Sequence, residues 1–426
     1  MKETMERLTA RCPIYDTVQQ LLQPEARLGC GKAVEEVPVD AGAGGKVLAL
    51  GSCGYQARVY SSAIDLPADW DQLAGGAQVF LSRNYLLAWE EVRPEGMALA
   101  YVVLERDGKA LGIVSLQVVE FRIGEALPQW ERLDWGLRVL VCGAAQASGP
   151  FGFVFAPEVG ATEQPVLLES VLELMRQRLG ARAVVVKDLA ETAFPAVRGG
   201  LKRSGFTAFD FEPNMVVEVD PAWRTLDDYL EAMTSKYRVR ARRAFRKGEH
   251  LGCRSLTLRD LQRYQDRMYT LYTEVADRAD FSLVRLQPGY FVRLKAAFGA
   301  SFKVIGYFDG ESLVGFCTVL RSGTAAEVHF LGFEEAYNTS AQLYLNMLLA
   351  SIRTGIEDFG SRRIILGRTA SVIKSSVGAR PHREQVWLRH SSWWVQALLP
   401  RVVRFLQPPI EVGEGLRHPF GEEVEG

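Results

Sequence analysis

Three consecutive segments decide the fold of this 426-residue chain: FKVIGYFDGESLVGFCTVL (302–320), AAEVHFLGFEEAYNTSAQLYLNMLLASIRTGIEDFG (325–360) and SRRIILGRTASVIKSSVGARP (361–381). The first predicts a hairpin, because Asp309-Gly310 separates two apolar, β-branched runs. The second predicts a strand over 325–333 and a long, largely buried helix from Gln342, and the third predicts a short strand that leads into another helix. This order of elements predicts a mixed α/β fold.

The strand over 325–333 carries two titratable side chains. Alternation along a strand places Glu327, His329, Leu331 and Phe333 on one face. A carboxylate or an imidazole can take a proton from a reacting amine, directly or through a water, so Glu327 and His329 are the candidate general bases. The alternative is that the histidine is a structural residue, as a single histidine in a strand often is.

The order hairpin, strand, helix, strand, helix resembles the catalytic half of the Gcn5-related N-acyltransferase (GNAT) superfamily. The phrases FLSRNYLLAWEE (80–91), LDDYLEAMTSKYRVRARRAFRKG (226–248) and LGRTASVIKSSVGARP (366–381) resemble its tandem branch, which contains Fem-type aminoacyl transferases and Gram-negative acyltransferases. The resemblance covers roughly residues 55–390. It implies two tandem GNAT-like domains, each a mixed, mostly antiparallel sheet flanked by helices.

The first half of the chain repeats the same order of elements. Strands over 98–105 and 110–121 flank a turn at Asp107-Gly108, and a strand over 137–142, a loop, a helix over 164–179 and a strand over 183–186 follow. This order predicts a duplicated domain. The expected divisions are an N-terminal extension or linker (1–55), an N-terminal GNAT-like domain (56–221), a C-terminal GNAT-like catalytic domain (222–390), and an amphipathic aromatic segment with an acidic tail (391–426).

The superfamily usually binds the donor pyrophosphate on a glycine-rich turn after the strand equivalent to 325–333. Here that turn reads EEAYNT (334–339) and has no glycine. Free amides at a helix start near Asn338, capped by Thr339 or Ser340, are the expected alternative site for an anion. Glu334 and Glu335 would oppose it. The glycines of the loop over 143–152 offer a second phosphate cradle, although ordinary turn structure is favoured because no Lys-Ser/Thr pair ends it.

Four further side chains are candidates for a role in the reaction. Arg368 and Lys374 follow the last strand, where the superfamily's acyl group and acceptor meet, and either one is suited to polarise a carbonyl or bind phosphate. Surface charge is the alternative. Tyr337 and Tyr344 are candidate proton donors to the leaving group, or packing residues.

A concentrated basic stretch lies between the two halves. Residues 235–247 carry seven cations and no acid, and Lys236, Arg238, Arg242 and Arg246 are the candidate anion-binding residues. They favour a polyanion such as a coenzyme A phosphate, the acidic face of an acyl-carrier protein, a tRNA acceptor arm or anionic lipid headgroups. The alternative is a solvated helix end that complements its own dipole.

Composition excludes other classes of protein. The net charge of −1 argues against global binding to nucleic acid, and no signal peptide or apolar run of about 18 residues is present, which predicts a cytoplasmic protein. Cysteines without CxxC spacing predict buried free thiols rather than a metal site; they are Cys12, Cys30, Cys53, Cys142, Cys253 and Cys317. The segment 387–409 holds three of the eight tryptophans with arginines beside them, which suits either peripheral contact with the inner membrane or docking on its own domain.

Three functions remain open. The first is an N-acyltransferase that moves an acyl group from acyl-CoA or acyl-carrier protein to an amphiphilic amine, such as a sphingoid base in bacterial ceramide synthesis or an amino lipid. The second is a Fem-like transferase that uses aminoacyl-tRNA. The third is a non-catalytic binding protein that retains the fold.

Overall fold

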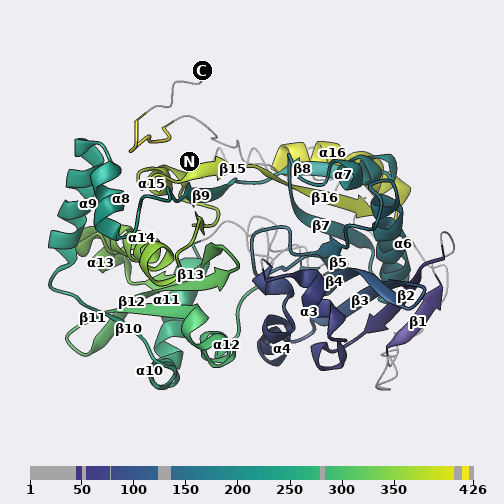
Figure 1. The fold of residues 1–426 in the computed structure, drawn as a ribbon, viewed down its shortest axis with the longest axis horizontal. Helices are drawn as coiled ribbons and strands as arrows, with labels where there is room; N and C mark the ends of the chain where they lie inside the picture. Colours follow the sequence, from purple (N-terminus) through teal and green to yellow (C-terminus); the bar gives the residue numbers. More distant parts are fainter. Residues whose placement is uncertain are drawn as a thin grey trace, which may run out of the picture.

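The computed structural model describes residues 45–49, 54–76, 78–122, 136–278, 284–406 and 415–421. Most of the predicted N-terminal extension, the tail 422–426 and three of the cysteines (Cys12, Cys30 and Cys53) lie outside these ranges. Within them, the chain forms two mixed sheets flanked by helices, which confirms the predicted fold class (Figure 1).

The first sheet has nine strands in the order β1-β2-β3-β4-β5-β7-β16-β8, with β6 paired to β4. Every pairing is antiparallel except β5 with β7. The strand β1 falls in the predicted extension, which is therefore partly a sheet edge. The bounds are β1 (Lys46–Ala49), β2 (Gln56–Tyr60), β3 (Ala98–Arg106), β4 (Lys109–Arg122), β5 (Gly136–Cys142), β6 (Phe153–Phe155), β7 (Ala183–Ala190), β8 (Thr207–Asp210) and β16 (Glu384–His390).

The second sheet has seven strands in the order β10-β11-β12-β13-β14-β9-β15. Its one parallel pairing joins β13 and β14. The hairpins β3-β4 and β11-β12 thus hold equivalent places, each followed by an antiparallel and then a parallel neighbour, as predicted. The bounds are β9 (Asn214–Glu218), β10 (Gly252–Ser255), β11 (Phe302–Asp309), β12 (Ser312–Ser322), β13 (Ala325–Phe333), β14 (Arg363–Ile365) and β15 (Arg380–His382).

The two halves of the chain exchange strands. β9, from the first half, lies between β14 and β15 in the second sheet, whereas β16, from the second half, lies between β7 and β8 in the first. Figure 1 shows these strands crossing along one side of the molecule. The predicted boundary between residues 221 and 222 therefore does not coincide with the division between the two sheets, since each sheet takes one strand from the other half.

The helices cover both faces of each sheet. Their bounds are α3 (Asp69–Ala74), α4 (Arg83–Val92), α6 (Glu163–Arg178), α7 (Pro195–Arg203), α8 (Leu226–Ala232), α9 (Ser235–Gly248), α10 (Leu258–Arg263), α11 (Gln265–Ala276), α12 (Tyr290–Phe298), α13 (Glu335–Ala341), α14 (Leu343–Arg353), α15 (Ser371–Ser375) and α16 (Trp393–Leu406). Short 3₁₀ turns span Ala63–Asp65, Val79–Leu81 and Gly299–Ser301, and a π-helical turn spans Thr354–Asp358.

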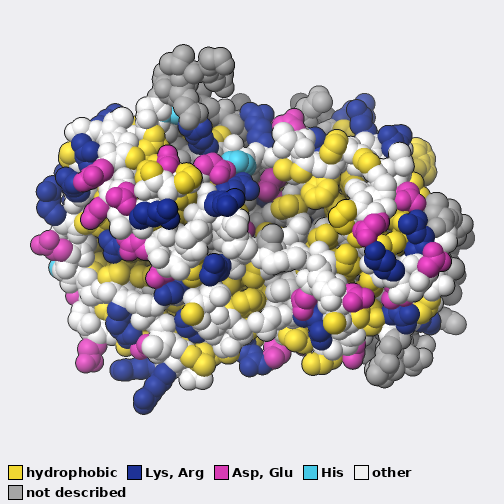
Figure 2. Space-filling view, viewed as in Figure 1, with side chains coloured by type: hydrophobic (Ala, Val, Ile, Leu, Met, Phe, Trp, Pro, Cys, Tyr) yellow, Lys and Arg dark blue, Asp and Glu magenta, His cyan; other side chains and the backbone are white. Residues whose placement is uncertain are grey.

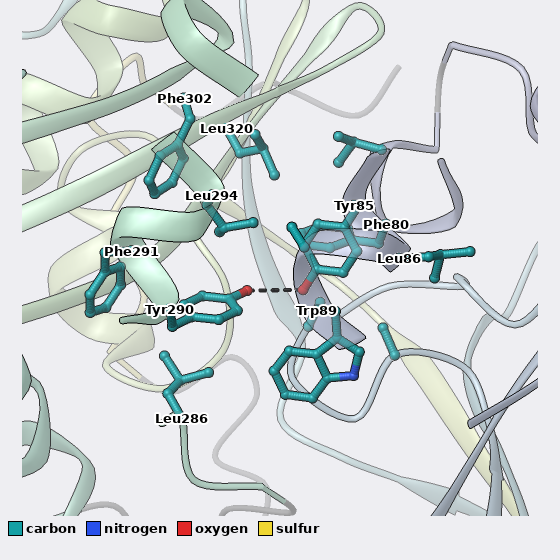
Figure 3. Packing of buried hydrophobic residues seen from close by; sticks show 14 of the residues in the cluster. Phe80, Tyr85, Leu86, Trp89, Leu286, Tyr290, Phe291, Leu294, Phe302 and Leu320 are labelled. Atoms are coloured by element: carbon teal, nitrogen blue, oxygen red, sulfur yellow. Dashed lines mark hydrogen bonds between the residues drawn. The ribbon is translucent and has the colours of Figure 1, made fainter. Parts of the chain in front are cut away.

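An aromatic core joins the two halves. Tyr85 and Trp89 from α4 pack against Tyr290 and Phe291 from α12, and the hydroxyl groups of Tyr85 and Tyr290 meet at 2.9 Å (Figure 3). Two further cores lie under α6 and α7 in the first half and under α9 and α14 in the second. Because the shared core is continuous, the two sheets are held in a fixed relation by apolar burial.

Candidate active site

The parallel pair β13 and β14 separates at Glu327. The ladder joins Ala325 to Arg363, Ala326 to Ile364 and Glu327 to Ile365, and β14 then ends while β13 continues to Phe333. A fork between parallel strands at their carboxyl ends is a common place for ligands in open α/β sheets. The candidate base Glu327 lies at this fork.

A β-bulge just beyond Glu327 changes which side chains share its face. The register of β12 against β13 shifts between Cys317 and Val319, and the Thr318 hydroxyl accepts from the Phe330 amide (3.0 Å) and donates to its carbonyl (2.8 Å). The extra residue inverts the alternation. Glu327 and His329 share a face as predicted, but Leu331 and Phe333 pack in the core on the opposite face, so that part of the prediction was wrong.

Glu327 is a buried carboxyl group, with 7% of its surface exposed. Burial and the nearby charge of Glu384 raise its pKa to about 8, while Arg363 acts in the opposite direction. The folded protein therefore holds this group largely protonated at neutral pH. Because its pKa lies near physiological pH, the group can both accept and release a proton there.

His329 is held by aromatic neighbours and one hydrogen bond. Its ring lies 5.1 Å from Phe80, 5.7 Å from Tyr290 and 4.4 Å from Phe330, measured between ring centroids. Its Nε2 atom lies 2.5 Å from the hydroxyl of Tyr290, which in turn forms a hydrogen bond with the hydroxyl of Tyr85. Burial lowers the His329 pKa to about 3, so the ring is neutral. These contacts favour a structural role, and Glu327 remains the stronger candidate base.

A buried charge cluster joins the two halves near Glu327. Asp188 on β7 accepts from Arg368 at 2.5 Å and lies 3.1 Å from the Lys187 ammonium, and Arg368 also donates to Glu384 on β16 at 3.0 Å. Burial opposes ionisation of Asp188, but Lys187 and Arg368 outweigh it and keep the Asp188 pKa below its usual value. Burial and the charge of Asp188 raise the Glu384 pKa to about 7.

The sequence contained a signal for this cluster that our prediction missed. Lys187 and Asp188 interrupt the otherwise apolar strand AVVVKDLA, and charged residues in a buried strand need partners. Asp188 also has a positive φ of 60° and accepts from the Gly149 amide at 3.0 Å. The glycine-containing loop over 143–152 is thus held against the cluster by hydrogen bonds.

Neither Arg368 nor Lys374 is an ordinary surface charge, because Lys374 is buried and only 16% of the Arg368 side chain is exposed. Lys374 has 4% of its surface exposed, and its ammonium group donates to the carbonyls of Gly367 (3.1 Å) and Arg368 (2.5 Å). Burial lowers its pKa to about 7. Arg368 pairs with Asp188 and Glu384 through its Nη2 atom, which orders the junction between the two halves, while its Nε atom is buried without a hydrogen-bond partner among the described residues.

Two sheets of this order, each built from a hairpin, an antiparallel strand and a diverging parallel strand, decide the fold. This arrangement is similar to that of solved tandem GNAT structures. No protein-family model and no curated protein matches it in sequence.

Solved structures similar to the chain include FemX (11% identity, TM-score 0.49, covering 74% of this chain and 93% of that one). A tandem GNAT protein from the clavulanic acid biosynthesis pathway has 13% identity and a TM-score of 0.47, covering 79% of this chain and 99% of that one. The C-terminal domain of a putative lysylphosphatidylglycerol synthetase from Agrobacterium fabrum has 14% identity and a TM-score of 0.44, covering 79% and 93%.

The predicted helix after β13 is divided in two. Gln342 has a left-handed conformation (φ 51°) between α13 and α14, so Thr339 and Ser340 lie inside α13 and cap neither helix. The predicted cap was therefore wrong. Ser340 donates to the Ala336 carbonyl at 3.0 Å, within the helix.

The other predicted residues of this segment are engaged locally. Tyr337 donates to Asp309 at the hairpin turn (2.7 Å), and Asn338 donates to Glu335 (2.8 Å). Glu334 pairs with Arg267 on α11, and Glu335 pairs with Arg278, just past the end of that helix, so both acids have cationic partners. The structure does not bring Tyr337, Asn338 or Thr339 into contact with Glu327.

The basic helix α9 presents its cations to solvent. Lys236, Arg242 and Arg246 are exposed, Arg238 is half-buried, and none of them forms an ion pair with an acid in the described part of the chain. Figure 2 shows cationic and acidic side chains interspersed over the face it displays. These four cations thus have no acidic partner in the described ranges, although Arg238 donates to the Glu231 carbonyl at 3.1 Å and Lys236 lies over the Tyr237 ring.

The described ranges offer neither a metal site nor a membrane span. They contain no group of three or more His, Cys, Asp or Glu residues placed to hold a metal ion. Among the described helices, none combines the length and apolar character needed to span a bilayer.

Proposed function

We propose that this chain is an N-acyltransferase whose reaction takes place beside Glu327. One observation carries the proposal: a buried carboxyl group with a pKa near 8 lies where two parallel strands diverge. A general base is most effective when its pKa lies near the working pH. No other carboxyl on β13 competes with it, because Glu327 is the only acid between residues 325 and 333.

The reaction follows from that placement. The Glu327 carboxylate takes a proton from the ammonium group of the acceptor, and the freed amine attacks the thioester carbonyl. The new C–N bond forms and the C–S bond breaks. The attacking nitrogen releases its second proton to water as the amide forms, and the leaving thiolate receives a proton from the Glu327 carboxylic acid. The dry surroundings strengthen each electrostatic contact in this sequence.

The proposed donor is acyl-CoA or acyl-carrier protein, and the proposed acceptor is an amphiphilic amine such as a sphingoid base or an amino lipid. Trp393 at the start of α16 supports an amphiphilic substrate, since its side chain is 80% exposed while Leu399 and Gln396 dock the helix on the first sheet. An exposed tryptophan with Arg401 on the same helix suits peripheral contact with a membrane.

The alternative is a Fem-like transferase that takes its acyl group from aminoacyl-tRNA. The unpaired cations of α9 favour it, because phosphates bind exposed lysines and arginines. Both alternatives use the same base and the same acceptor chemistry, so the donor distinguishes them.

The test is turnover with each donor. Purified protein is offered long-chain acyl-CoA, acyl-carrier protein or aminoacyl-tRNA, each with sphinganine, and amide product is measured by mass spectrometry. Glu327→Gln is expected to lower the rate ~10²–10⁴-fold, whereas Glu311→Gln, the same change at the exposed hairpin turn, is expected to have no effect.

Product from aminoacyl-tRNA alone would select the Fem-like alternative. Undiminished turnover in Glu327→Gln would remove Glu327 as the base. If the wild-type protein gives no product with any donor, a non-catalytic binding role replaces the proposal.

A further inference from the structure

A cavity of about 190 Å³ lies on the side of the second sheet away from Glu327. Tyr307 and Leu343 in its wall belong to the core under α9 and α14, whereas His329, on the face of Glu327, contacts the core shared by the two halves. It is therefore separate from the candidate active site. Its lining comes from α9, the segment after it, β10, β11 and α14.

The cavity has an apolar wall and a cation at its edge. Phe245, Leu251, Leu343 and Ala350 supply the apolar surface. Arg353, in the last turn of α14, is exposed and has no acidic partner in the described ranges. An apolar pocket with a few placed polar groups is the usual form of a small-molecule site.

The charge of Arg353 reaches the cavity wall. Burial raises the pKa of the Cys253 thiol, and a hydrogen bond from Tyr307 and the positive charge of Arg353 both reduce that rise. Glu249 is the one acid in the lining, and the last turn of α9 beside it carries Arg246 and Lys247. The cations around the opening therefore outnumber the acid.

We propose that this cavity binds the end of one alkyl chain of an anionic amphiphile, whose head group pairs with Arg353. The volume matches about six water molecules at ~30 Å³ each and falls below the ~300–1,000 Å³ of a drug-sized pocket. It accommodates a chain end and excludes a whole two-chain lipid. The shared chemistry is an acidic head group and one inserted alkyl chain end, supplied by a free fatty acid or by one of the two chains of a bilayer lipid.

The thiol of Cys253 provides a direct readout of occupancy. Alkylation of full-length protein by N-ethylmaleimide is followed at the Cys253 peptide by mass spectrometry, so other cysteines do not interfere. Decanoate below its micelle concentration is expected to slow this alkylation several-fold and saturably, and decylamine is expected to have little effect. The same alkylation is repeated with phosphatidylglycerol vesicles in place of decanoate, to test a bilayer lipid as the source of the chain.

Two variants locate the site. Arg353→Gln is expected to weaken protection by decanoate about two- to fivefold, as for an exposed ion pair, while Arg362→Gln, the same change at an exposed arginine outside the lining, has no effect. Ala350→Phe fills the cavity and is expected to abolish protection. Arg353→Gln alters an exposed side chain, so it remains informative if Ala350→Phe does not fold.

Protection by decanoate assigns the site to free acids, and protection by phosphatidylglycerol vesicles alone assigns it to bilayer lipids; both outcomes support the proposal. Equal protection by decanoate and decylamine overturns it. Unchanged alkylation with every probe, or full protection of folded Ala350→Phe, overturns it as well.

Discussion

At the scale of single residues, the burial of Glu327 links catalysis to stability. The folded-state pKa of about 8 lies above the ordinary value of 4.5, so the folded protein keeps a proton that the unfolded chain has lost between those pH values. Its contribution to stability is fully present below about pH 4.5 and is lost as pH rises towards 8.

We therefore expect the stability of the wild type to fall relative to that of Glu327→Gln as pH rises from about 5 to 8. The slope should approach at most ~1.4 kcal/mol per pH unit. Urea unfolding of both proteins across this range measures the difference, with Glu311→Gln following the wild type. A difference that is independent of pH would show that Glu327 titrates normally.

Asp188 makes Arg368 a structural necessity. Asp188 is fully buried, and Arg368 is one of its two cationic partners. Arg368→Gln should cost ~3–5 kcal/mol in the free energy of unfolding, because it leaves a buried charge without adequate compensation. Chemical denaturation measures this cost.

Arg362→Gln serves as the control, since Arg362 is exposed. The double variant Asp188→Asn with Arg368→Gln should recover part of the loss, as asparagine tolerates the left-handed backbone at this position. A loss of less than about 1 kcal/mol in the free energy of unfolding of Arg368→Gln is what an exposed ion pair would give. It would contradict the role of Arg368 in compensating the buried charge of Asp188.

At the scale of elements, α9 is an exposed basic helix whose cations contribute little to folding. Replacing Arg238, Arg242 and Arg246 with glutamine should lower the salt concentration for elution from heparin while leaving the melting temperature nearly unchanged, since exposed charges contribute under ~1 kcal/mol each. Replacing the exposed Arg178, Lys202 and Arg203 of α6 and α7 gives the same change in charge and should leave elution less affected. If the elution salt concentration shifts equally in the two triple variants, the net charge of the protein alone explains binding to heparin, and α9 is not a specific site.

The elements that could be predicted are those fixed by local sequence. Both Asp-Gly turns were predicted correctly, because a glycine with positive φ is required there; Gly108 and Gly310 have φ of 76° and 57°. The faces of β13 beyond His329 could not be predicted. They depend on a hydrogen bond from Thr318 on the neighbouring strand, which a single-strand pattern does not contain.

The candidate site shows the same division. Glu327 was predictable from its place on a strand before a helix, and its burial was not. The partners of Arg368 lie 180 and 16 residues away in sequence, on strands of the first sheet. Only the exchange of strands brings Arg368 and these partners together. The sequence therefore showed that Lys187 and Asp188 are charged but not which residues they pair with.

At the scale of the molecule, the exchanged strands and the shared aromatic core make the two halves interdependent. We expect fragments 1–212 and 213–426 to be insoluble or unfolded when expressed separately, because the first lacks β16 between β7 and β8. Co-expression should restore a soluble complex, and the intact chain should unfold in a single transition by circular dichroism and tryptophan fluorescence. A folded, monomeric fragment 1–212 would contradict this expectation.

The place of β16 also has a consequence for biosynthesis. The first sheet cannot close until the ribosome has released residue 390, although its other strands are complete by residue 210. At ~5–20 residues per second, the nascent chain spends roughly 10–35 s with the edges of β7 and β8 open. Those edges are sites for wrong pairing with other chains. The cell's ribosome-associated chaperones are therefore expected to engage this protein during that interval, and slower translation should lengthen the exposure.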